Sequence, residues 1–155
     1  MLAEAPSVEV QHTEAAAAAA VSEEELQLHF VRPLIGLERS THFVLRPLGP
    51  QYEPYASLVS LDEPDLRFVV VPPGVIFRDY VIEIPESDRR LLDLRDAGEV
   101  AVLAIVRRHG VPAPVVNLMG PIVVNRRTQA AAQVVLQESD YGVMVPVDAG
   151  TARPA

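Results

Sequence analysis

The side chains that could do chemistry in this chain are four histidines and one cluster of loop carboxylates. The histidines are His12, His29, His42 and His109. They never stand two or four residues apart, so their spacing does not predict a metal site. Asp62, Glu63 and Asp65 could bind a cation, but carboxylates beside a proline more often form a solvated turn. The chain has no cysteine, Gly-x-Ser-x-Gly elbow or glycine-rich phosphate loop. The residues therefore predict no cofactor and no metal, and no pattern favours a catalytic carboxylate pair.

Two other places combine residue types that are common in protein interfaces. Phe77-Arg78-Asp79-Tyr80 puts two aromatics and an arginine at a junction between a loop and a strand. Asn117 and Arg126 belong to a later block with a charged hairpin tip. We predict a partner-binding surface from these six residues. The competing interpretation, also open, is that Phe77 and Tyr80 fill the end of the barrel while the charged side chains simply face solvent.

The elements that must position these residues are mostly short strands. Alternating apolar residues and proline or glycine turns predict eight of them, at 26–31, 43–46, 56–61, 67–71, 80–84, 100–106, 121–125 and 133–137. The strand at 100–106 is apolar on both faces and should be covered on both. One helix is predicted, with Ser87 as its cap and Gly98 as its end. The pattern predicts a mainly β fold, a small antiparallel β-barrel-like domain with one short helix.

The composition divides the 155 residues into a domain and two tails. Residues 1–25 hold six glutamates, no arginine and a run of alanines, so we expect a disordered or transiently helical acidic tail. Residues 26–146 form the β domain, and 147–155 a C-terminal tail. Beyond the acidic tail, 15 acidic residues face 13 arginines, which is too balanced for a nucleic-acid binder. No secretion signal or membrane-spanning run is present, so we expect a cytoplasmic protein.

The block at residues 117–141, NLMGPIVVNRRTQAAAQVVLQESDY, resembles the C-terminal half of the flagellar assembly factor FliW family. That family has an Asn-Leu-x-Ala-Pro-Ile-Val-Ile-Asn run, a basic link, a Gln-Val-Val-Leu strand and a Ser-Asp-Tyr close in the same order. Residues 34–38, 43–45 and 66–70 extend the resemblance toward the N-terminus. Ile35, Leu37 and Gly120 depart from the family pattern, which puts partner affinity in doubt.

The resemblance implies a protein that is not an enzyme. FliW proteins bind newly made flagellin in the cytoplasm and also bind CsrA, a dimeric RNA-binding translational repressor, so flagellin synthesis follows flagellin export by partner switching. We also expect a free monomer that binds neither nucleic acid nor membrane directly. The alternatives are a small-molecule-binding or hydrolytic β-barrel without a recognisable motif, and an RNA-binding barrel. A polar pocket would favour the first, and basic residues among exposed aromatics the second.

Overall fold

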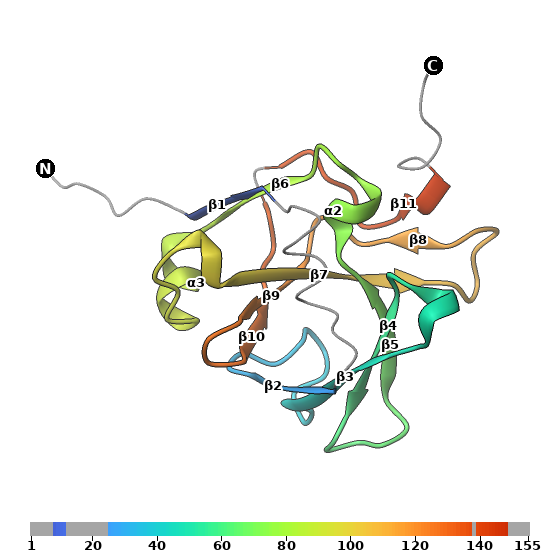
Figure 1. Cartoon of the computed structure of the whole chain (residues 1–155), viewed down its shortest axis with the longest axis horizontal. Coiled ribbons are helices and arrows are strands. Elements are labelled where there is room, and N and C mark those ends of the chain that lie inside the picture. The colour runs from blue at the N-terminus through green and yellow to red at the C-terminus, as the bar shows by residue number, and fades with distance from the viewer. Residues whose placement is uncertain (1–7, 12–24, 138, 149–155) are drawn as a thin grey trace, which may run out of the picture.

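The computed structural model describes residues 8–11, 25–137 and 139–148. The elements of this part of the chain are short and follow one another closely (Figure 1). In chain order they are β1 Val8–Gln11, β2 Leu26–Phe30, β3 His42–Pro47, the 3-10 helix η1 Pro50–Tyr52, β4 Ala56–Ser60, β5 Arg67–Val71, α2 Pro73–Ile76, β6 Val81–Ile84, α3 Glu86–Leu91, the 3-10 helix η2 Ala97–Glu99, β7 Val100–Arg107, β8 Val115–Val116, β9 Ile122–Asn125, β10 Ala130–Gln133 and β11 Val145–Pro146.

Seven of these strands close into a barrel in the order β7-β5-β4-β3-β2-β10-β9, and β9 pairs back onto β7. The mainly β, barrel-like prediction is confirmed. The barrel is mixed, because β10 pairs parallel with β2 while the other neighbours in the ring are antiparallel. A closed ring with an odd number of strands cannot alternate direction throughout. One parallel pair is therefore required by the strand count.

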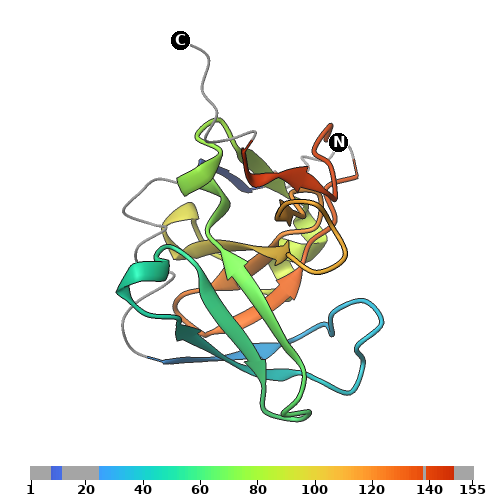
Figure 2. The ribbon, with the colours of Figure 1, turned by 90° about the vertical axis from the view of Figure 1, so that its right-hand side faces the viewer.

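Two apolar layers lie on opposite faces of β7. The barrel core contains Leu28, Phe30, Phe43, Leu58, Val70, Leu103 and Ile122, with contributions from all seven ring strands. The outer core contains Tyr80, Ile82, Ile84, Leu92, Leu94, Val116, Leu118 and Val123. It lies where β6, α3 and the 116–118 segment cover the outside of the barrel (Figure 2). β7 supplies residues to both layers, which confirms the prediction of a strand covered on both faces.

The predicted helix is shorter than its sequence pattern indicated. α3 is capped by Pro85 without a side-chain hydrogen bond, and Ser87 lies inside it. Gly98 belongs to η2 and does not end α3. The helix ends because Asp93 takes a left-handed conformation, with φ of 52°. That break lets Leu92 and Leu94 both turn into the outer core, which a continuing helix could not do with residues two apart.

The second strand of the C-terminal hairpin also differs from the prediction. The apolar run at 133–137 has high β propensity, but the ladder strand is β10, Ala130–Gln133. Ala131 and Ala132 are fully buried, one in each apolar layer, because successive residues of a strand point to opposite faces of the sheet. After β10, the chain runs beside residues 119–121: the N–H groups of Val134 and Leu136 donate to the carbonyls of Pro121 and Met119.

The short strands β8 and β11 and the 3-10 helices were not predicted, and neither were β1 and α2. β1 pairs antiparallel with β6, with Val8 opposite Ile84. These four residues lie in the segment expected to be a disordered or transiently helical tail, and that expectation is wrong for them. The rest of that tail, residues 1–7 and 12–24, lies outside the described residues. α2 begins at Pro73, where proline needs no N–H partner, so the prolines that end β5 also start this turn of helix.

Candidate partner-binding site

Phe77, Arg78, Asp79 and Tyr80 form a tight corner, the 77–80 corner, between α2 and β6. The N–H of Phe77 donates to Pro73 O at 2.8 Å and ends α2, and the N–H of Tyr80 donates to Phe77 O at 3.0 Å. Arg78 and Asp79 are exposed at the tip, and neither forms an ion pair with a described residue. The corner therefore presents one positive and one negative side chain on a fixed backbone.

The two aromatics of the corner face inward. Phe77 is half-buried against the outer core, and Tyr80 is only 2% exposed within it. The Tyr80 hydroxyl donates to Leu118 O at 2.7 Å. Burial, with a smaller contribution from neighbouring Tyr141, raises the pKa of Tyr80 far above its ordinary value, so the hydroxyl stays a neutral donor. Tyr80 is thus a buried residue, as the competing interpretation expected, but it lies in the outer core and not in the barrel core, and its hydroxyl positions the corner.

Tyr141 holds the corner from the other side. Its ring packs on that of Tyr80 with centroids 4.6 Å apart. Its hydroxyl accepts the N–H of Val81 at 3.0 Å and donates to Val81 O at 3.1 Å. The Ser-Asp-Tyr close of the sequence therefore serves to clamp the first residue of β6.

Asn117 lies next to this corner and shapes the chain that follows it. Its Oδ1 accepts the N–H groups of Met119 at 3.1 Å and Gly120 at 3.0 Å. Its own N–H donates to Ile105 O on β7. Because the Leu118 carbonyl accepts the hydrogen bond of the Tyr80 hydroxyl, the turn that starts at Asn117 is joined to the 77–80 corner. The structure therefore brings Asn117 and the corner together.

Arg126 lies elsewhere. It occupies the turn between β9 and β10, beside α3, whereas the 77–80 corner follows α2 on another side of the molecule (Figure 1). Its N–H donates to Glu99 O at 2.7 Å, and its exposed guanidinium lies 3.4 Å from Gly98 O. The predicted six-residue surface is thus two separate surfaces, one of them containing Arg126 alone.

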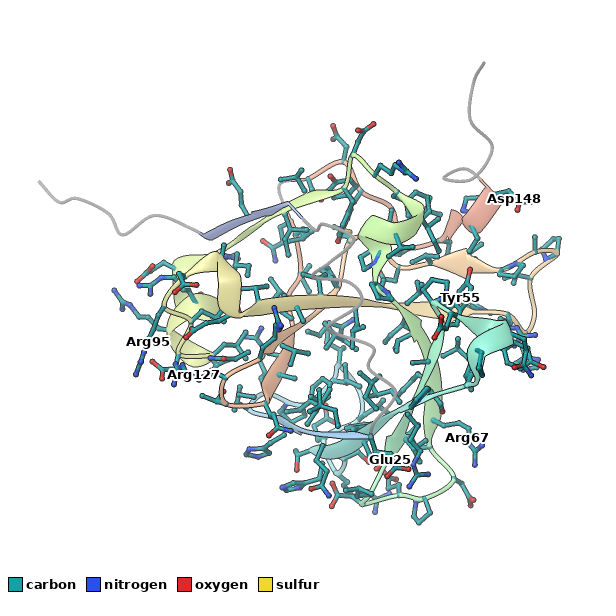
Figure 3. All side chains as sticks on the ribbon, viewed as in Figure 1. Glu25, Tyr55, Arg67, Arg95, Arg127 and Asp148 are labelled. Atoms are coloured by element: carbon teal, nitrogen blue, oxygen red, sulfur yellow. The ribbon has the colours of Figure 1, made fainter. Side chains whose placement is uncertain are left out.

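Arg127 is the more engaged of the two arginines in that turn. It binds Asp93 Oδ2 at 3.0 Å, Asp93 O at 2.8 Å and Glu99 Oε2 at 2.8 Å, and it lies close to Arg95 beside α3 (Figure 3). Arg127 holds the pKa of Asp93 below its usual range. The pKa of Glu99 is lowered first by the N–H of Arg95 and then by Arg127. Arg127 therefore fastens the hairpin turn to the chain after α3.

Asn125, which the sequence analysis did not single out, completes that attachment. It is fully buried, and its Nδ2 donates to Leu92 O at 2.7 Å and Asp93 O at 3.1 Å. Its Oδ1 accepts the N–H groups of Arg127 at 2.8 Å and Thr128 at 3.2 Å. An asparagine at the end of an apolar strand was the available signal, because a buried amide needs such partners.

A groove of about 980 Å³ runs between β6 on one side and residues 133–137 and 139 on the other. We call it the β6 groove; Glu83 lies on one wall and Val135 on the other. Arg32 crosses it, donating to Asp88 Oδ1 at 2.6 Å and Gln133 O at 2.8 Å. Ile35, 75% exposed, stands at the rim. No local sequence pattern indicated this groove, since residues from three distant segments build it.

Within the described residues, no cluster of three or more potential ligands could hold a metal ion. Over the same residues, no helix is long and apolar enough to cross a membrane.

The family model described as "FliW protein" matches residues 10–147. The chain belongs to the FliW family. The match begins inside β1, ahead of residue 26, where the sequence analysis placed the start of the domain. FliW proteins are non-enzymatic flagellar assembly factors.

Relatives named flagellar assembly factor FliW agree with this. The Bacillus licheniformis protein is 35% identical over 81% of this chain and 87% of its own length. The Bacillus subtilis protein is 33% identical over 82% of this chain and 88% of its own length. The Nitratidesulfovibrio vulgaris protein is 37% identical over 69% of this chain and 62% of its own length. A crystal structure titled as the flagellar assembly factor FliW superposes with a TM-score of 0.71, at 26% identity, over 78% of this chain and 84% of that one.

The three departures from the family pattern fall in different environments. Ile35 is exposed at the groove rim, and Leu37 packs against the barrel core. Gly120 is buried, and a Cβ there would stand 3.0 Å from Gln133 Nε2, which donates to Gly120 O. An alanine at 120 would therefore require the Gln133 side chain to shift.

Proposed function

We propose that this protein binds flagellin and a CsrA-type translational repressor in the cytoplasm, one at a time, and so couples flagellin synthesis to export. The observation that carries the proposal is membership of the FliW family over residues 10–147. The mechanism is competition by mass action: the partner in excess over its dissociation constant occupies the shared factor. The free protein is a monomer and contacts no nucleic acid or membrane itself.

The 77–80 corner is the proposed centre of a partner surface. Arg78 and Asp79 are exposed, whereas Tyr80 and Tyr141 fix the backbone beneath them. A fixed backbone means that little conformational entropy is lost when a partner binds. Asn117 extends this surface through its turn, and Arg126 forms a second, separate contact.

The charge distribution supports a basic partner. Six of the 21 acidic residues lie in residues 1–25, and the rest of the chain is nearly neutral. A repressor that binds RNA presents a basic surface, so long-range attraction would raise the association rate and would weaken as salt screens it.

Calorimetric titration tests the proposal with flagellin and the repressor from the same organism. Each should bind the full chain saturably. Arg78→Ala, Asp79→Ala and Arg126→Ala should weaken at least one partner at unchanged melting temperature. Arg67→Ala is the matched control, because Arg67 is an exposed arginine on β5, away from the 77–80 corner (Figure 3). Absence of binding by both partners would refute the function. Wild-type affinity in all three variants would refute only the proposed surface.

A further inference from the structure

The β6 groove is bordered by two backbone edges, and no strand of the described residues lies between them. Among the described strands, β6 pairs with β1 alone, on one side. Val81 lies opposite Gln11 in the ladder. Its N–H donates to the Tyr141 hydroxyl oxygen, and its carbonyl accepts the Tyr141 hydroxyl proton. In an antiparallel pair, the N–H and carbonyl of one residue point toward the partner strand, and those of the next residue point away from it. Glu83, two residues on and opposite Glu9, therefore also directs its N–H and carbonyl away from β1, toward the groove.

The opposite wall has the same property. Val134 and Leu136 donate their N–H groups to Pro121 O and Met119 O, on the side away from the groove. Val135 lies between them in an extended segment, so its N–H and carbonyl point the other way, into the groove that it lines. Within the described residues, neither Val135 nor Glu83 makes a further hydrogen bond across the groove.

The side chains around the groove indicate what would fit. Ile35 and Val135 are exposed, and Val81 is half-buried, so apolar side chains lie on both sides of the groove, among polar ones. Arg32 is already neutralised by Asp88 at 2.6 Å. The exposed carboxylate of Glu83 forms no ion pair with any described residue. The groove thus offers apolar contacts, unpaired backbone groups and one free negative charge.

We propose that the β6 groove binds an extended segment of a partner protein, which adds as a strand between β6 and the 133–137 segment. The segment carries apolar side chains at alternate positions and a basic residue opposite Glu83. Main-chain hydrogen bonds supply affinity in this mode, and the side chains supply selectivity. This inference rests on the proposed function in one respect: the segment is taken to belong to flagellin or to the CsrA-type repressor.

Val135→Pro tests the backbone contact directly. Proline removes the N–H that faces the groove and spares those of Val134 and Leu136, and extended edge positions tolerate it. Val135→Thr is the matched control, because threonine keeps the N–H and the branched shape. Titrated with flagellin and the repressor, Val135→Pro should lose tenfold or more in affinity for at least one of them, and Val135→Thr should stay within twofold. Unchanged binding of both partners by a folded Val135→Pro protein would overturn the proposal.

A second probe needs neither partner and no variant. A synthetic peptide of about nine residues with alternating valine and threonine and a central arginine has the proposed chemistry. Amide hydrogen exchange followed by NMR should show the Glu83 and Val135 N–H groups exchanging readily in the free protein and protected when the peptide is bound. Unprotected amides at a saturating peptide concentration would overturn the proposal. If neither full-length partner binds, the proposed function is refuted. The peptide experiment still decides whether the groove accepts a strand.

Discussion

Replacing Tyr80 by phenylalanine isolates one hydroxyl on which the geometry of the 77–80 corner depends. That hydroxyl donates to Leu118 O at 2.7 Å, and both residues are almost fully buried, at 2% and 3% exposure. Phenylalanine keeps the ring and its packing on Tyr141, but it leaves the Leu118 carbonyl without a donor. A buried polar group left unsatisfied costs about 1–3 kcal/mol, so we expect about 2 kcal/mol of lost unfolding free energy. For a chain of this size that is a fall in melting temperature of about 4–8 °C.

The assay is thermal unfolding by circular dichroism, with urea unfolding at 25 °C as the measure of free energy. Tyr52→Phe is the control, because Tyr52 is 54% exposed and its hydroxyl makes no hydrogen bond to a described residue. It should change the free energy by less than about 0.5 kcal/mol. If Tyr80→Phe melts at the same temperature as Tyr52→Phe, the hydroxyl is not the tie between the corner and the 117–120 turn, and our account of the corner is wrong.

Two further predictions concern the turn between β9 and β10. Asn125→Ala removes four hydrogen bonds from a fully buried position and should cost about 3 kcal/mol or more in urea unfolding, whereas a cost below about 1 kcal/mol would contradict its role. The pKa values of Asp93 and Glu99 are lowered in the folded protein, so their contribution to stability is present above the unfolded-state pKa values of about 4 and is lost as the pH falls through the folded values. Urea midpoints at pH 7 and pH 3 should therefore differ less in Arg127→Ala than in the wild type, and equal differences would show that Arg127 does not set these pKa values.

The strands of the barrel were predictable because period-two alternation and proline or glycine turns mark them locally. The apolar pattern of β7 even revealed that it would be covered on both faces. The ends of α3 and β10 were not predictable, because tertiary packing decides them. Leu92 and Leu94 both enter the outer core only if the helix stops. Ala131 and Ala132 have low β propensity, and they form a buried strand because β10 pairs with β2 and β9.

The candidate site was predictable only in part, for a related reason. Residues 77–80 are contiguous, so their composition identified the corner, and the Tyr80 hydroxyl joins it to the segment after Asn117. Arginine is common in protein interfaces, which is why Arg126 was included. Its position in the sequence could not show that it lies beside α3. The β6 groove left no local signal, because Arg32, Glu83 and Val135 meet only in the folded chain.

Partner switching, the central claim, is tested most directly by competition. The protein is first saturated with the CsrA-type repressor, flagellin is added in increasing amounts, and the species are separated by size-exclusion chromatography with light scattering. We predict that flagellin releases the repressor stoichiometrically and that no complex contains all three proteins. A stable ternary complex, or repressor that stays bound when flagellin is in excess over its own measured dissociation constant, would contradict the account.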